Sequence, residues 1–242
     1  ACSFGGTSVP ATWVSSETLR CTSPLASAEG PVPVRVTNNG VDFGESSAPF
    51  EYAAVPSVSH VTPLSGPRLG GTLVTVQGAN FANVSSMCCR FGRTVVSASY
   101  LSPTAVVCVA PPRSRRGSNG TALLSVSSNG VDFVPAPSAF VYTAVPVITS
   151  IFPAGGMLRG GTPVRVLGAN LSPPENQTTL CRFGPQHTVA AVVESSSSIT
   201  CTSPDIGANS TTSVAVGLSN NGGADFSSSG VAFSYRDVVE LY

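Results

Sequence analysis

Cys89-Arg90-Phe91-Gly92, followed by Cys108-Val109-Ala110-Pro111 and then Asn129-Gly130-Val131-Asp132-Phe133, forms a pattern that occurs three times along the chain. Each copy closes on a tyrosine, and these tyrosines (52, 142 and 235) lie 90 and then 93 residues apart. A period near ninety residues predicts tandem copies of one small module. The other copies are Cys2-Ser3-Phe4-Gly5, Cys21-Thr22-Ser23-Pro24 and Asn39-Gly40-Val41-Asp42-Phe43, and Cys181-Arg182-Phe183-Gly184, Cys201-Thr202-Ser203-Pro204, Asn221-Gly222 and Asp225-Phe226.

A glycine-rich opening half precedes this motif in the second copy, from Pro56 to Phe81, and in the third, from Pro146 to Leu171. Valines such as Val74 and Val76 alternate there with polar residues, which is the period of a half-buried strand. The same alternation precedes each Asn-Gly pair, and Asn-Gly predicts hairpins with type I′ turns. No segment shows a helical period, so the sequence predicts an all-β protein.

The repeats predict module boundaries. Because no opening half precedes Cys2, we expect the first copy to be a fragment of a module, and Ala1 not to be a native beginning. Three residues separate each closing tyrosine from the next opening proline, and proline fixes its own φ, so we expect an extended rod with little hinge freedom. The predicted segments are 1–52, the C-terminal half of a first module; 53–142, the second module; 143–235, the third; and 236–242, the start of a linker or next segment.

Six of the seven cysteines fall at positions fixed by the repeat, 19, 19 and 20 residues apart. Paired cysteines without a CxxC motif or histidine partners predict disulfides in an oxidising compartment rather than zinc sites. Closing a loop of about 20 residues contributes roughly 3 kcal/mol in the chain-entropy model. The predicted disulfide cysteines are Cys2 and Cys21, Cys89 and Cys108, and Cys181 and Cys201.

Cys88 is the cysteine left over. Only Cys89 aligns with the repeat, and neighbouring side chains of a strand point to opposite faces, so we expect Cys88 to point outward. It is then either a free thiol or the site of an intermolecular bridge. Five glycosylation sequons fit a secreted surface with N-linked glycans. They are Asn83, Asn119, Asn170, Asn176 and Asn209.

The ordered motifs resemble the IPT/TIG module, an immunoglobulin-like domain shared by plexins, Met-type receptors and certain transcription factors. The motifs are Pro-x-x-Gly-Pro-x-x-Gly-Gly-Thr, Gly-x-Asn-Phe, Cys-x-Phe-Gly, Cys-x-x-Pro, Asn-Gly-x-Asp-Phe and Phe-x-Tyr. The resemblance covers 56–142 and 146–235 completely and 2–52 as a C-terminal half, and it implies tandem two-sheet β-sandwiches arranged end to end. The third copy departs at Ala154-Gly155-Gly156, at Leu171 and by an inserted Gly223.

Composition excludes several classes of function. The formal net charge is zero and 10% of residues are charged, against roughly 25% in ordinary domains, so nothing favours nucleic acid or an anionic membrane. No apolar run approaches the roughly 20 residues of a membrane span, which predicts no direct membrane insertion. His60 and His187 lie in different modules outside any catalytic motif. We expect no enzyme activity, no cofactor and no metal.

Three repeated features have a binding interpretation and a structural one. Asp42, Asp132 and Asp225 follow the Asn-Gly pairs, and turn capping explains them better than calcium, which needs six to eight oxygen ligands. The phenylalanines of Cys-x-Phe-Gly (4, 91 and 183) are expected in the core rather than on a binding surface. The basic cluster is expected to be a solvated loop, with a polyanionic glycan contact as the alternative. It consists of Arg113, Arg115 and Arg116.

Three functions are consistent with these observations. The first and favoured one is a structural or adhesive segment of an extracellular or cell-surface protein, with modules serving as spacers and lateral-assembly units of a fibre or filament. Its partners would be neighbouring modules, other copies or other extracellular proteins. The second is the stalk of a plexin- or Met-like receptor ectodomain. The third, DNA binding as in transcription factors, is disfavoured by zero net charge, paired cysteines and sequons.

Overall fold

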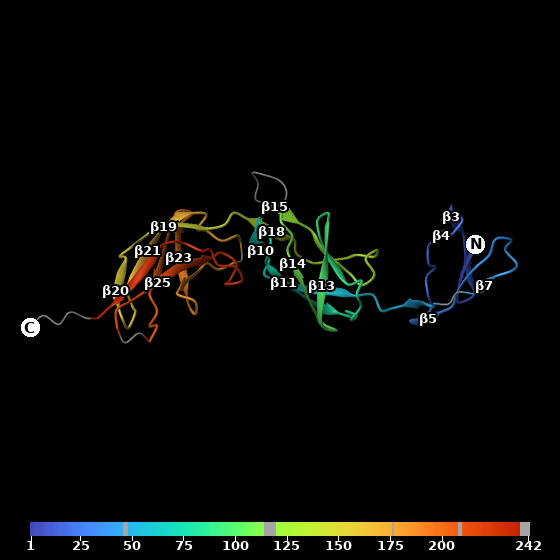
Figure 1. Ribbon diagram of the computed structural model, residues 1–242, viewed down its shortest axis with the longest axis horizontal. Coiled ribbons are helices and arrows are strands. Elements are labelled where there is room, and N and C mark those ends of the chain that lie inside the picture. Colours follow the sequence, from blue (N-terminus) through green and yellow to red (C-terminus); the bar gives the residue numbers. More distant parts are fainter. Residues whose placement is uncertain (46–47, 114–119, 176, 208–209, 238–242) are drawn as a thin grey trace, which may run out of the picture. The chain divides into compact units, whose positions relative to one another are not determined.

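The computed structural model describes the chain except residues 46–47, 114–119, 176, 208–209 and 238–242. Every regular element in the described ranges is a strand (Figure 1), so the predicted all-β class is confirmed. The chain divides into two compact units, Ala1–Val55 and Pro56–Tyr242. The second unit contains both the second and third copies of the repeat, and each unit is described by itself.

The first unit consists of three small antiparallel sheets. One has the order β2-β1-β6-β7, and the pairs β3-β4 and β5-β8 form the others. Trp13 on β3 is 70% exposed, whereas Tyr100, which occupies the corresponding position of module two, is packed against that module's core. The strands are β1 (Cys2–Phe4), β2 (Thr7–Val9), β3 (Ala11–Ser15), β4 (Thr18–Cys21), β5 (Gly30–Val32), β6 (Val34–Val36), β7 (Gly44–Glu45) and β8 (Phe50–Tyr52).

Module two is a sandwich of a seven-stranded sheet, β17-β16-β12-β13-β14-β11-β9, and a three-stranded sheet, β10-β18-β15. The long strand β13 pairs with β12 through its first half and with β14 through its second half. Its strands are β9 (Ser57–Thr62), β10 (Ser65–Pro67), β11 (Leu73–Ala79), β12 (Cys88–Phe91), β13 (Thr94–Ser102), β14 (Ala105–Val109), β15 (Gly120–Ala122), β16 (Leu124–Ser127), β17 (Val134–Pro135) and β18 (Phe140–Thr143).

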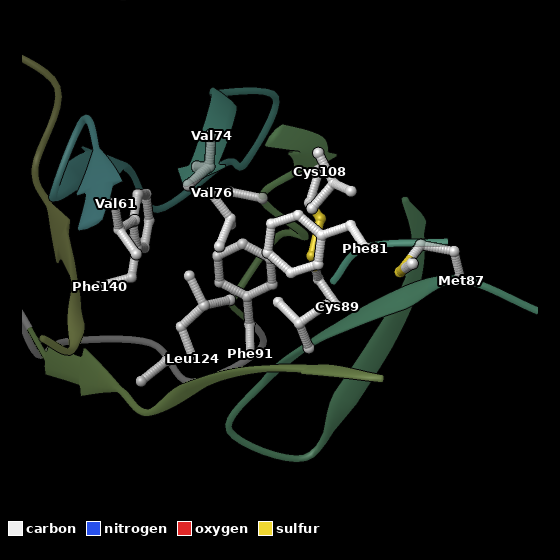
Figure 2. Close-up of a cluster of buried hydrophobic side chains, with 14 of the residues drawn as sticks. Val61, Val74, Val76, Phe81, Met87, Cys89, Phe91, Cys108, Leu124 and Phe140 are labelled. Carbon is white, nitrogen blue, oxygen red and sulfur yellow. A yellow bond between two sulfur atoms is a disulfide. The ribbon is translucent and has the colours of Figure 1, made fainter. Parts of the chain in front are cut away.

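The core of module two is formed by the apolar residues that alternate along these strands. Val74 and Val76 on β11 are fully buried, as the two-residue period predicts. Figure 2 shows the Cys89–Cys108 disulfide within this cluster, close to the ring of Phe81. The disulfide joins β12 to β14, so it connects two non-adjacent strands of the sandwich through the core.

Module three repeats this architecture in one continuous sheet, β19-β21-β24-β23-β22-β25-β26-β20. Strand β25 pairs with β26 through its first half and with β22 through its second half, and so replaces the separate strands β15 and β16 of module two. Its strands are β19 (Val147–Phe152), β20 (Gly155–Met157), β21 (Pro163–Ala169), β22 (Leu180–Phe183), β23 (His187–Ser195), β24 (Ser198–Thr202), β25 (Thr212–Ser219) and β26 (Ala232–Arg236).

The closing tyrosine of each copy connects the end of the repeat to its Cys-x-x-Pro motif. Its hydroxyl donates a hydrogen bond to the proline carbonyl at 2.8–2.9 Å in all three copies. Its ring also continues an edge-to-face series with two phenylalanines, one of them the phenylalanine of Cys-x-Phe-Gly. That phenylalanine is buried in every copy, as expected. The three series are Phe4–Phe50–Tyr52, Phe91–Phe140–Tyr142 and Phe183–Phe233–Tyr235.

The turns after the Asn-Gly pairs differ from the predicted type I′ geometry. Strands on either side do pair in antiparallel fashion, but the loops are longer than two residues, since Val36 pairs with Gly44 and Val126 with Val134. A type I′ turn needs positive φ at both central residues. The glycine of the pair has a positive φ in every copy, 78° for Gly40, 75° for Gly130 and 70° for Gly222, but Asn129 does not have a positive φ. The asparagine instead accepts backbone hydrogen bonds through its side-chain oxygen, which shapes a wider loop.

Candidate functional site

A cluster of polar contacts in the second unit lies at the junction at which module three contacts module two. Asp225 Oδ2 accepts a hydrogen bond from Thr72 Oγ1 at 2.7 Å, and Asn221 Nδ2 donates to the carbonyl oxygen of Ser65 at 3.0 Å. The amide of Gln177 also bonds Ser65, with its oxygen accepting from the backbone N–H of that residue at 3.2 Å once the amide is oriented to satisfy both ends. We call these five residues the module junction.

The junction arises from a local change in the repeated Asn-Gly loop. In module two, Asn129 donates to Asp132 three residues later, at 2.8 Å, and both residues are exposed. In module three the inserted glycine places Asp225 four residues after Asn221, and Asn221 is only 7% exposed. The bulky Val131 of module two, 77% exposed, has no counterpart in the Gly222-Gly223-Ala224 segment of module three.

A cleft of about 420 Å³ borders the junction. It is lined from module two by Gly66, Pro67 and Leu69, and from module three by the Asn220–Asn221 and Ala224–Ser228 segments. Thr72 and Ser65 are almost fully buried, so their hydrogen bonds to module three replace bonds to water. The insertion of Gly223 is visible in the sequence, but nothing in the repeat predicts that it accompanies a contact between modules.

The repeated aspartates cap turns in all three copies. Asp42 accepts from Asn39 Nδ2 at 2.7 Å, as Asp132 and Asp225 accept from their own preceding asparagines. Within the described part of the chain, no group of three histidine, cysteine, aspartate or glutamate side chains could hold a metal ion. His60 is exposed on β9 and His187 half-buried on β23, so the fold does not bring the two histidines together.

The six repeat-locked cysteines form three disulfides, with Cα–Cα distances of 6.3–6.4 Å. Cys88 has no disulfide partner and is only 7% exposed, so the expected exposure of its side chain is wrong. Alternation along the strand does hold, because Cys89 joins the core cluster and Cys88 does not. The outer face is covered next to the Asn129-Gly130 loop, and burial raises the pKa of the Cys88 thiol. A buried thiol of raised pKa is a poor nucleophile.

The remaining predicted positions are exposed, half-buried or outside the described residues. Asn83 and Asn170 are exposed, and Asn170 donates from Nδ2 to the Val145 carbonyl at 3.2 Å. Arg113 donates to the Thr121 carbonyl at 3.0 Å, and its guanidinium lies 5.5 Å from the ring centre of Tyr142. Five other predicted positions lie outside the described residues: Arg115, Arg116, Asn119, Asn176 and Asn209.

Among the described residues there is no helix of the length and apolarity that a membrane crossing requires. The IPT/TIG domain model matches residues 1–52, 56–142 and 146–235. Mouse Plexin-A2 is 27% identical over 206 residues, covering 83% of this chain and 11% of that protein. Mouse Fibrocystin-L is 32% identical over 165 residues, covering 66% of this chain and 4% of that protein.

A solved structure of the Plexin A4 extracellular region aligns with a TM-score of 0.53 at 18% identity, covering 90% of this chain and 19% of that one. The chain spans only about a tenth of the length of mouse Plexin-A2. Its disulfides and its plexin relatives indicate an extracellular or cell-surface location. With three model matches that cover nearly all of its length, the chain belongs to the IPT/TIG domain family.

Proposed function

We propose that this chain is a non-catalytic segment of the extracellular stalk of a plexin-type receptor, in which it acts as a spacer. The observation that carries the proposal is the module junction. Thr72 and Ser65 of module two are hydrogen-bonded to Asp225 and Asn221 of module three, and a spacer needs neighbouring modules held in one arrangement. The module boundaries, 53–142 and 143–235, are part of this proposal.

The plexin relatives favour the stalk over the fibre or filament that low charge content favoured in the sequence. A fibre built by lateral packing needs a surface poor in charge throughout the chain. Charge is in fact unevenly divided, since residues 56–142 contain six arginines and one aspartate, a formal charge of +5. The modules are therefore not uniformly uncharged, as side-by-side packing would require.

The proposed segment is non-catalytic, and the structural role of the polar side chains in its repeated loops supports this. The asparagine, serine and aspartate side chains of the repeated loops bond to one another and to their own backbone. Partners of the segment are proposed to be neighbouring modules, N-linked glycans at exposed sequons such as Asn83, and other extracellular proteins.

The proposal is tested by measuring the distance between modules two and three. Spin labels attached at Ser99→Cys and Thr188→Cys, in a Cys88→Ser background, report the distance by double electron–electron resonance. Both label positions are exposed. We expect a single narrow distance distribution, and we expect it to broaden when Asn221→Ala and Asp225→Ala remove the junction's hydrogen bonds.

The matched control replaces the equivalent pair of module two, Asn129→Ala and Asp132→Ala. These residues have the same loop contacts but lie outside the junction, so the distribution should stay narrow. Two results would refute the spacer function: a broad distance distribution in the chain with an unaltered junction, or a distribution that the Asn221 and Asp225 substitutions leave unchanged.

A further inference from the structure

The net charge of the whole chain is zero, but the formal charge differs strongly between its modules. Residues 56–142 hold six arginines and one aspartate, a formal charge of +5. Residues 1–52 hold two arginines and five acidic residues, a charge of −3, and residues 146–235 hold three arginines and four acidic residues, a charge of −1. Module two is therefore strongly basic, although the whole chain is neutral.

Three of these arginines line one groove of module two. The groove has a volume of about 730 Å³ and its wall includes Arg90, Arg93 and Arg113. None of the described residues that line it is acidic. By contrast, Arg165 in module three lies 3.5 Å from Glu194 and is paired with it. The groove therefore gathers positive charge without the carboxylates that neutralise such charge elsewhere.

Two of the guanidinium groups are held in place by neutral partners. Arg90 donates from Nε to Ser125 Oγ at 3.2 Å, and its guanidinium lies 4.0 Å from the ring centre of Phe133. Arg113 donates from Nη1 to the Thr121 carbonyl at 3.0 Å. An arginine carries five N–H donors, so each of these side chains retains several for a ligand. Their orientation is fixed before any ligand arrives, which lowers the entropy cost of binding.

The other modules do not reproduce the groove. At the positions of Arg93 and Arg113, module three has Pro185 and Ile206, and Asp205 stands where module two has Pro112. In module one, the three arginine positions are occupied by Ser3, Gly6 and Ala26. Arg93 and Arg113 are therefore specific to module two, whereas Arg90 has a counterpart in Arg182, which stacks on Phe226 at 4.2 Å in module three. Module three, with one of the three arginines, serves as an internal comparison.

We propose that this groove binds a sulfated polysaccharide, with Arg90, Arg93 and Arg113 contacting sulfate groups. The planar guanidinium fork matches tetrahedral oxyanions by two parallel hydrogen bonds, and every basic residue of this chain is arginine rather than lysine. The groove exceeds the size of a single sulfate, and an extracellular module meets sulfated chains rather than nucleic acid. The inference concerns module two alone and does not depend on the spacer function.

The test uses the whole chain and immobilised heparin as the probe. We expect the variant Arg90→Gln, Arg93→Gln, Arg113→Gln to lose about 10-fold or more in affinity, because charge-assisted contacts are lost. The slope of log affinity against log salt concentration should also fall by about one for each contact removed. The double variant Arg93→Gln, Arg113→Gln leaves the Arg90–Phe133 stack intact, so it separates loss of binding from loss of folding.

The control variant removes the same amount of charge elsewhere, by Arg20→Gln, Arg68→Gln and Arg159→Gln. None of these residues lines the groove. If the control loses as much affinity as the groove variant, attraction is unspecific and the site is refuted. Fully desulfated heparin tests whether the sulfate groups are needed, and poly-glutamate represents an acidic protein as the ligand. If either binds as tightly as heparin, the sulfate assignment is refuted. We expect both to bind at least about 10-fold more weakly than heparin.

Discussion

Replacing Tyr142 by phenylalanine should destabilise module two by removing one buried hydrogen bond while leaving its aromatic packing in place. The Tyr142 hydroxyl donates to the Pro111 carbonyl at 2.8 Å, and both residues are buried. Phenylalanine at this position keeps the edge-to-face contact with Phe140, whose ring centre is 5.1 Å away. The substitution therefore isolates the contribution of the hydroxyl group.

The expected magnitude follows from what the substitution leaves behind. The Pro111 carbonyl would be buried without a donor, and an unsatisfied buried polar group costs about 1 to 3 kcal/mol. For a module of this size, 1 kcal/mol lowers the melting temperature by roughly 4 to 8 °C. Calorimetry gives the overall shift, and hydrogen exchange followed by mass spectrometry assigns it to module two rather than module three.

Tyr100 provides the matched control within the same module. Its side chain is half-buried against the core and its hydroxyl has no hydrogen-bond partner among the described residues. Tyr100→Phe should therefore change stability by less than about 0.5 kcal/mol. Equal shifts for Tyr142→Phe and Tyr100→Phe would show that the closing tyrosine stabilises by packing alone and that its hydrogen bond to Pro111 adds nothing measurable.

Three further outcomes are expected. Reducing the disulfides should lower the stability of each module by roughly 3 kcal/mol, measured as the denaturant midpoint with and without reductant; an unchanged midpoint would contradict this. Burial and the charge of Asp205 raise the pKa of Tyr235 to about 12, so the stability that neutral Tyr235 contributes is complete below about pH 10 and is lost as pH rises toward 12. Tyr235→Phe should reduce this loss of stability at alkaline pH. Native Cys88 should react slowly with thiol reagents and the chain should run as a monomer without reductant, whereas rapid labelling or a dimer removed by Cys88→Ser would overturn the buried assignment.

The repeat allowed the fold to be predicted because its residues act within a single module. The alternation of Val74 and Val76 places both on the core face, and the spacing of Cys89 and Cys108 places them within reach of each other in two strands of the sandwich. Such contacts depend on strand period and loop length, and both can be read from the sequence. The hydrogen bond of Tyr142 to Pro111 follows the same repeat, but the sequence pattern alone does not identify a hydrogen-bond partner for the tyrosine.

Two predictions were wrong, the type of the Asn-Gly turn and the exposure of Cys88, because both used local rules that do not account for longer loops or for segments that cover a strand. Asn-Gly predicted a two-residue turn, but the side chain of Asn129 bonds to the loop backbone and favours a longer loop. That loop in turn lies over the face on which Cys88 sits, so an outward direction did not mean an exposed thiol. Strand period determines the direction of a side chain, whereas burial depends on which segments pack over it.

Most residues shared by all three copies are occupied within their own module: the cysteines bond to each other, the tyrosine bonds to the proline, and the aspartate caps its turn. Asn221 and Asp225 are shared residues that also bond to module two, and they do so in the copy whose loop is altered. Departures from the repeat are therefore the positions free to serve contacts outside the module. The inserted Gly223 is one such departure, and it accompanies the only Asn-Gly loop that bonds to another module among those in the described chain. Arg93 and Arg113 are others, and both line the basic groove. In this chain, function is to be sought where the copies differ, because most of the positions at which they agree are already used by the fold, and Asn221 and Asp225 reach another module only in the copy with the inserted glycine.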